Sequence, residues 1–155
     1  MSTGNKVLMV TNKGEIILQL FPEHASGTVK NFKSFVNQGL YDGVLFHRVE
    51  ENFLIQTGDP LTKDPNQQNL WGTGGTDHQL LSKEDKISDI LKHRPGAVVV
   101  ADPYRSQFYI VLTRKTAKHL DGKYMIFAQV VKGMDKINRM EIGDKIIRMT
   151  VLPNM

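Results

Sequence analysis

The sequence predicts a mainly β protein in which seven or eight short strands form a closed barrel or a sandwich. Short runs rich in β-branched and aromatic residues recur along the chain, separated by clusters of glycine, proline, asparagine and aspartate. Only two segments have the period of a helix, and strands do not alternate with helices as they do around parallel sheets. Closing the sheet would remove its exposed edges, which favours a barrel or a sandwich.

The first two predicted strands form a hairpin. Residues 6–12 and 14–20 are rich in residues that favour strands, and Asn12, Lys13 and Gly14 have the composition of a tight turn. Because proline has no backbone N–H to donate to a sheet, Pro22 ends the second strand.

Residues 25–38 have the period of an amphipathic helix, with lysine and glutamine opposite an apolar stripe. The stripe consists of Val29, Phe32, Phe35 and Val36. Gly39 is a natural helix end, and Ser26 or Thr28 could cap the first turn.

Residues 46–60 contain two further strands. Arg48 interrupts an apolar run, and a cation in such a run needs a partner or a function. After a polar turn, alternation puts Leu54 and Gln56 on one face of the second strand and Ile55 on the other. Two interpretations are open for this segment: a half-buried surface strand, or one side of a functional site.

Residues 61–89 form a long polar segment with weak periodicity, which is typical of a functional or ordered surface loop. The glycine-rich residues 72–75 suggest either a phosphate cradle or a backbone shape that only glycine allows. No lysine with a following serine or threonine comes after them in the phosphate-loop order, so we expect the second role.

Residues 96–101 and 106–112 are predicted as buried strands. In the second, alternation puts Gln107 and Tyr109 on one face and the intervening apolar residues on the other. This repeats the arrangement at residues 54–56, where an amide and a large apolar side chain project together.

The C-terminal part of the chain adds two strands and a short helix. Residues 125–131 and 145–152 have strand composition. Between them, Met134, Ile137 and Met140 follow the spacing of one helical face.

Composition narrows the class of protein. The 155 residues suit one domain, 1–155, and the absence of cysteine excludes disulfides and thiolate chemistry and fits the reducing cytoplasm. Residues 1–5 are polar, and no run approaches the ~18 apolar residues of a membrane span. The net charge of +4 is scattered, so nucleic acid is not an expected partner. We expect a cytoplasmic monomer.

Several short motifs follow one another along the chain. They are Phe46-His47-Arg48-Val49, Phe53 with Gln56, Gly58-Asp59-Pro60, Gly72-Thr73-Gly74-Gly75, Ser106-Gln107-Phe108 and Leu120-Asp121-Gly122-Lys123. In this combination the sequence resembles the cyclophilins, peptidyl-prolyl cis/trans isomerases that act in protein folding. The resemblance covers residues 6–152 and implies a closed eight-stranded antiparallel β-barrel capped by two α-helices, one at each end.

The resemblance also implies an active site on the outer barrel face, with Arg48 matching the catalytic arginine. The other matching positions form the proline pocket, hold the substrate backbone, support the arginine or stand at the rim. Pocket walls match Phe53, Leu54, Tyr109 and Leu120; backbone-binding and supporting positions match Gln56, Ala101, Asp102 and Gln107; rim positions match His47 and Tyr124. His119 is also expected among the substrate-binding residues.

The implied reaction is rotation about Xaa-Pro bonds of peptides and folding protein clients. It needs no covalent step, metal or cofactor, because a donor aimed at the twisted amide is sufficient. His47 is not expected to act as a general base or metal ligand, since no proton moves and no second histidine lies at ligand spacing. The alternative is a catalytically weak module that binds proline-containing segments.

Three positions depart from the family pattern. His119 stands where many members carry a tryptophan, which implies weakened affinity for cyclosporin. Residues 100–106 form a shorter loop and carry Asp102 where asparagine is common. Tyr109 adds a hydroxyl that needs water or a protein partner if it is buried. The other histidines, expected to be surface or structural, are His24, His78 and His93.

Overall fold

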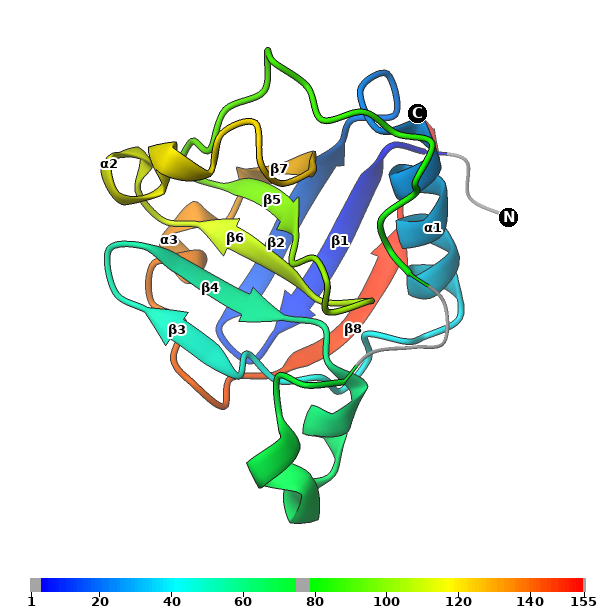
Figure 1. Ribbon diagram of the computed structural model, residues 1–155. Coiled ribbons are helices and arrows are strands. Elements are labelled where there is room, and N and C mark those ends of the chain that lie inside the picture. Colours follow the sequence, from blue (N-terminus) through cyan, green and yellow to red (C-terminus); the bar gives the residue numbers. More distant parts are fainter. Residues whose placement is uncertain (1–3, 75–78, 155) are drawn as a thin grey trace.

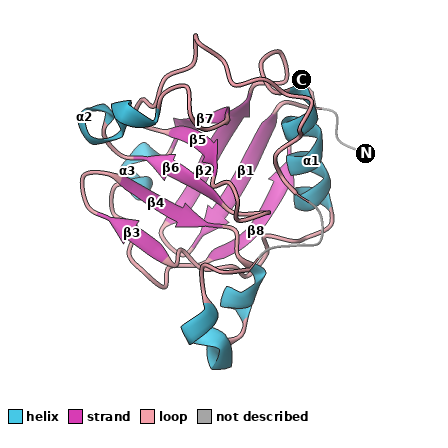
Figure 2. Ribbon diagram, in the orientation of Figure 1, coloured by secondary structure: helices cyan, strands magenta, loops and turns pink. Residues whose placement is uncertain are grey.

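The computed structural model describes residues 4–74 and 79–154, so Gly75 and His78 lie outside the described residues. Eight strands form one sheet in which neighbouring strands are antiparallel (Figures 1 and 2). They are β1 (Lys6–Thr11), β2 (Gly14–Leu20), β3 (Arg48–Glu50), β4 (Leu54–Thr57), β5 (Ala97–Val100), β6 (Phe108–Val111), β7 (Ile126–Lys132) and β8 (Ile146–Val151). Their order across the sheet is β3-β4-β6-β5-β7-β2-β1-β8. The predicted mainly β class with eight antiparallel strands is confirmed.

The sheet curls into a half-barrel, which corrects the prediction of a completely closed barrel. Within the described residues, the edge strands β3 and β8 share no ladder. An isolated bridge joins Leu45 to Lys145, and the Phe46 N–H donates to the Asp144 carbonyl at 2.8 Å. The bonds to the β8 side come from residues 43–46, which precede the three-residue strand β3. A few backbone bonds therefore span the remaining gap.

The strand predictions are confirmed to within one or two residues at each end. β1 and β2 pair in the predicted hairpin, with Thr11 opposite Gly14. The φ angle of Gly14 is +129°, which a glycine adopts without the steric cost of a side chain. Alternate residues of both strands are buried, as the period of two requires.

Helix α1 (Ser26–Asn37) lies at one end of the curled sheet (Figure 1). Its buried stripe is the predicted one: Val29, Phe32, Phe35 and Val36. The expected cap from Ser26 or Thr28 is wrong. The Asp85 carboxylate instead accepts the backbone N–H groups of Gly27 and Thr28 at 3.1 and 2.7 Å. A negative group at a helix N-terminus satisfies free N–H groups and complements the helix dipole.

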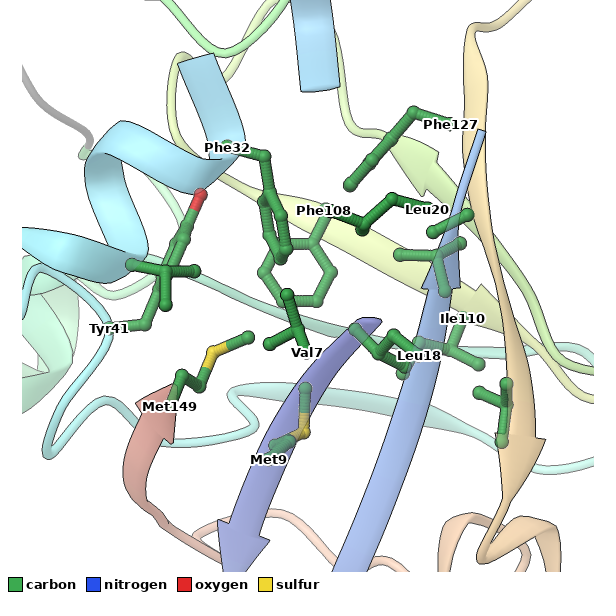
Figure 3. Close-up of a cluster of buried hydrophobic side chains, with 14 of the residues drawn as sticks. Val7, Met9, Leu18, Leu20, Phe32, Tyr41, Phe108, Ile110, Phe127 and Met149 are labelled. Carbon is green, nitrogen blue, oxygen red and sulfur yellow. The ribbon is translucent and has the colours of Figure 1, made fainter. Parts of the chain in front are cut away.

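The core lies inside the curl and under α1, where aromatic rings meet (Figure 3). The ring centroid of Phe32 lies 5.6 Å from that of Phe108 and 4.9 Å from that of Phe127. Tyr41 packs on the same group and donates its hydroxyl to the Ser106 carbonyl at 2.8 Å. Buried side chains of β1, β2 and β8 complete the cluster, which thus joins both sides of the half-barrel.

The short C-terminal helix is confirmed as α3 (Met134–Ile137), at the end of the sheet opposite α1 (Figure 1). Ile137 and Met140 are buried in the core, and Met134 packs against it. This agrees with the predicted helical face.

Four helical segments were not predicted as such. Each has at most six residues and lacks apolar residues at helical spacing, so the sequence shows no helical period there. They are η1 (Pro60–Lys63), η2 (Pro65–Leu70), α2 (Arg114–Ala117) and η3 (Lys118–Leu120).

Among the described residues, no helix has the length and apolar character to span a bilayer.

Candidate active site

A hollow of about 200 Å³ opens on the sheet face that points away from the core. Alternation in β4 and β6 creates this face, because Leu54 and Tyr109 point outward while Ile55 and Phe108 point into the core. Nine predicted site residues line the hollow: Arg48, Phe53, Leu54, Gln56, Ala101, Asp102, Tyr109, Leu120 and Tyr124. Their individual roles stay predictions.

The strand register brings the polar residues of the hollow together. Arg48 on β3 is the cross-strand partner of Gln56 on β4, and Gln56 is the partner of Tyr109 on β6. Side chains of directly opposite residues share one face of a sheet and lie within contact distance. A residue pattern of period two is thus converted into one compact row across three strands.

A directed chain of hydrogen bonds runs inward from Arg48. Its Nη1 donates to Gln56 Oε1 at 3.2 Å, and Gln56 Nε2 donates to Gln107 Oε1 at 2.8 Å. Gln107 Nε2 then donates to the Gly74 carbonyl at 2.8 Å. Because arginine can only donate, Gln56 must present its oxygen to Arg48, which fixes the orientation of both amides. Gln107 therefore lies behind the hollow and supports the arginine through Gln56.

Arg48 has a second partner that the sequence interpretation missed. Its Nη2 bonds Glu50 Oε2, two residues along the same strand. The Arg48 side chain is 46% exposed, so the guanidinium is held from two sides and still faces solvent at the hollow. The signal for Glu50 was its spacing, since residues i and i+2 share one strand face.

Asp59 organises the loop that reaches the amide chain. Its buried carboxylate accepts the backbone N–H groups of Leu61 at 2.9 Å, Gly72 at 2.7 Å and Gly74 at 3.1 Å. A Cβ atom at Gly74 would lie 2.5 Å from Asp59 Oδ1, so only glycine fits there. The expected backbone-shape role is thus supported for residues 72–74.

Apolar and aromatic side chains form the walls of the hollow. Leu54 and Tyr109 belong to a buried cluster on this face, with Phe53, Leu120 and Tyr124 packed against it. The Tyr109 and Tyr124 rings meet edge to face with centroids 6.2 Å apart. Such walls suit a compact apolar group rather than a charged one.

His119 and His47 were predicted as site residues, and neither lines the hollow. His119 stacks on the Phe53 ring, with centroids 6.1 Å apart, so it touches the wall from outside. Both ring nitrogens of His47 are buried without a partner among the described residues. Burial lowers the pKa of His47 more than the nearby Asp59 raises it, which favours the neutral ring.

The buried hydroxyl of Tyr109 has a protein partner. His93 Nε2 lies 2.7 Å from it, and His93 Nδ1 lies 3.1 Å from Asp121 Oδ1. Arg114 Nη2 pairs with the other Asp121 oxygen at 2.9 Å. Burial raises the pKa of Asp121, but the bonds from Arg114 and His93 outweigh it and lower the pKa to about 2. His93 is therefore structural, as expected, and adjoins the site.

The loop between β5 and β6 supplies a wall residue that was not predicted, Tyr104. Its backbone N–H donates to the Ala101 carbonyl at 2.8 Å, and its carbonyl accepts the Gln107 N–H at 2.8 Å. These bonds hold a tight turn that carries Tyr104 and the exposed Asp102 at the rim. No spacing rule identifies a loop aromatic of this kind, because its direction depends on the turn.

Among the described residues, no group of three or more histidine, cysteine, aspartate or glutamate side chains is placed to hold a metal ion.

Comparison with known sequences defines the family. Residues 6–151 match the sequence model for cyclophilin type peptidyl-prolyl cis-trans isomerase/CLD. Peptidyl-prolyl cis-trans isomerase 9 of Schizosaccharomyces pombe is 39% identical over 146 residues, which are 91% of this chain and 22% of that protein. Peptidyl-prolyl cis-trans isomerase-like 1 of Rhizopus delemar is 37% identical over 145 residues, which are 90% of this chain and 82% of that protein.

Comparison with solved structures gives the same result. A cyclophilin type peptidyl-prolyl cis-trans isomerase from Cryptosporidium parvum, crystallised in the presence of the dipeptide Ala-Pro, aligns with a TM-score of 0.77 and 25% identity. The alignment covers 96% of this chain and 99% of that one. This chain belongs to the cyclophilin-type peptidyl-prolyl cis-trans isomerase family. It spans about a fifth of the first two curated relatives it matches, 22% and 21% of their lengths.

Proposed function

We propose that the protein catalyses cis/trans isomerisation of Xaa-Pro bonds, with Arg48 as the catalytic residue. The observation that carries this proposal is a guanidinium held by Gln56 and Glu50 at the edge of a hollow with apolar and aromatic walls. A donor and an apolar ring site side by side are what this reaction requires.

The reaction requires few functional groups, but its energy barrier is high. The amide is resonance-stabilised, and its rotation barrier is ~18–20 kcal/mol. In the twisted state conjugation is lost and the proline nitrogen carries a localised lone pair. Arg48 donates to that lone pair and so stabilises the twisted state more than either planar state. Each ~1.4 kcal/mol of such differential binding gives a tenfold higher rate.

Different residues of the site bind the proline ring and stabilise the twisted amide. The walls at Phe53, Leu54 and Tyr109 grip the pyrrolidine ring, so the acyl side of the bond is the part that rotates. Arginine suits the donor role because it stays charged and its N–H groups have fixed directions. The Gln56 and Gln107 amides keep that direction constant during rotation.

The proposed substrates are proline-containing peptides and folding protein clients. The presence of Ala-Pro with the Cryptosporidium parvum relative supports a short Xaa-Pro peptide as the first substrate to test.

Cyclosporin is a proposed ligand of reduced affinity because of His119. A monomeric, cytoplasmic protein is our further proposal, supported by the scattered charge and the absence of cysteine.

A protease-coupled assay on an Ala-Pro peptide tests the function, with peptide binding measured in parallel. Arg48→Ala should lose most turnover and keep binding. Arg139→Ala is the matched control, since Arg139 is an exposed arginine with a carboxylate partner outside the hollow. If wild type and Arg48→Ala turn over alike, the catalytic assignment is wrong. If both bind and neither catalyses, the binding-module alternative replaces it.

A further inference from the structure

A buried row of polar groups lies behind the Tyr109 wall. His93 is 0% exposed, its ring stacks on Tyr109 with centroids 5.8 Å apart, and its Nε2 lies 2.7 Å from the Tyr109 hydroxyl. On its other side, Asp121 Oδ1 accepts the His93 backbone N–H at 2.7 Å and lies 3.1 Å from Nδ1. Among the described residues, the His93 ring thus connects the Tyr109 hydroxyl to the Asp121 carboxylate.

The carboxylate decides which ring nitrogen carries the proton. An ionised carboxylate can only accept hydrogen bonds, so Nδ1 must carry the hydrogen that faces it. In a neutral imidazole the other nitrogen is then an acceptor. The hydroxyl of Tyr109 must therefore donate to Nε2, and its hydrogen points away from the hollow.

Burial favours this neutral state of the His93 ring. Burial is the largest influence and lowers the pKa of His93; Asp121 raises it, Arg114 and His119 lower it, and the net shift is downward. Burial also raises the pKa of the Tyr109 hydroxyl, which stays protonated and able to donate. The groups that face His93 are thus one carboxylate, one guanidinium, one imidazole and one phenol.

We propose that His93 is a positioning residue that keeps the proline pocket apolar by holding the Tyr109 hydroxyl hydrogen out of it. The same residue fixes the second wall, because Asp121 follows Leu120 directly and is anchored to the His93 backbone and to Arg114. Two walls, Tyr109 on β6 and Leu120 at the end of η3, therefore share one buried support.

The consequence for substrate is specificity for an unsubstituted apolar ring. With its hydrogen committed to His93, Tyr109 presents a ring surface and no free donor to the hollow. If the hydroxyl lost its acceptor, it would need another partner, and an apolar ring bound against it would leave it unpaired. Proline binding would weaken, in the planar and twisted states alike.

The state of the His93 ring is measured directly by long-range ¹H–¹⁵N correlation of the imidazoles in the wild-type protein at neutral pH. His93→Phe identifies the signals by their loss. We expect the Nδ1–H form with a bare Nε2. Finding the Nε2–H form would overturn the proposal, because that nitrogen would then donate to Tyr109. This readout does not depend on turnover.

A double-mutant cycle tests the effect on substrate, and it rests on the proposed function. His93→Phe should raise the KM for an Ala-Pro peptide about tenfold with kcat changed less than about twofold, since ring binding is uniform. In the Tyr109→Phe background, the same substitution should change KM less than about twofold. An equal rise in both backgrounds would mean that His93 only fills space. Inactive wild type would contradict the proposed function and leave the spectroscopic test to decide this inference.

Discussion

Asp59→Asn should destabilise the protein and weaken its activity, although Asp59 does not line the hollow. The carboxylate uses both oxygens: Oδ1 accepts from Leu61, and Oδ2 accepts from Gly72 and Gly74. An asparagine has one oxygen for these three donors. If it keeps the two glycine bonds, its NH₂ group faces the Leu61 N–H, and two donors meet in a buried place.

The size of the effect follows from these bonds. Losing one hydrogen bond to a charged group costs ~1.5–3 kcal/mol, and the remaining two bonds weaken when the acceptor becomes neutral. We expect a loss of about 3 kcal/mol in the free energy of unfolding. For a domain of this size that corresponds to a fall in Tm of roughly 6–12 °C. The Gly74 carbonyl also anchors Gln107, so kcat/KM should fall several-fold.

Urea unfolding and the peptide assay measure both effects. Asp64→Asn is the matched control: the Asp64 carboxylate accepts the Asn66 backbone N–H at 2.9 Å at the start of η2, where asparagine caps equally well. It should change stability by less than ~0.5 kcal/mol. A change below ~1 kcal/mol for Asp59→Asn would refute this account of the loop.

Three further predictions concern packing in the core, the loss of stability at low pH, and ligand binding. Phe32→Ala should cost ~3–5 kcal/mol in urea unfolding because it leaves a cavity among aromatic rings, whereas Ile142→Ala, at a residue 65% exposed, should cost less than ~0.5 kcal/mol. The pKa of Asp121 is lowered from 3.8 to about 2, so its stabilisation is present above pH 3.8 and is lost as pH falls through 2. The stability difference between wild type and Asp121→Asn should shrink over that range, and a constant difference would contradict the assignment. His119→Trp should raise the affinity for cyclosporin, measured by calorimetry. Tight cyclosporin binding by the wild-type protein would contradict the prediction that His119 weakens this affinity.

The parts of the fold that the sequence predicted depend on local periodicity. Strand alternation placed Gln56 and Tyr109 on one face, and the sheet register then made them neighbours. The helical stripe of α1 was visible because apolar residues recur at its period over twelve residues. Such patterns need no knowledge of distant parts of the chain.

The missed features depend on contacts between distant segments. Asp85 caps α1 across 58 positions, and Asp121 reaches His93 across 28. A single sequence gives no distance between such residues, so neither pair was predictable from it. The incomplete closure of the barrel has the same origin, since it depends on how the short β3 meets the turn before β8.

The central claim is that Arg48 lowers the rotation barrier of a bound Xaa-Pro bond. Two-dimensional exchange NMR on an Ala-Pro peptide at equilibrium measures the cis/trans exchange rate with catalytic amounts of protein. Losing one aligned donor to a developing charge costs about 100-fold or more in rate. We therefore predict exchange cross-peaks with wild type and with Arg139→Ala, and exchange about 100-fold slower with Arg48→Ala at equal peptide occupancy. Equal exchange rates for wild type and Arg48→Ala would contradict the account.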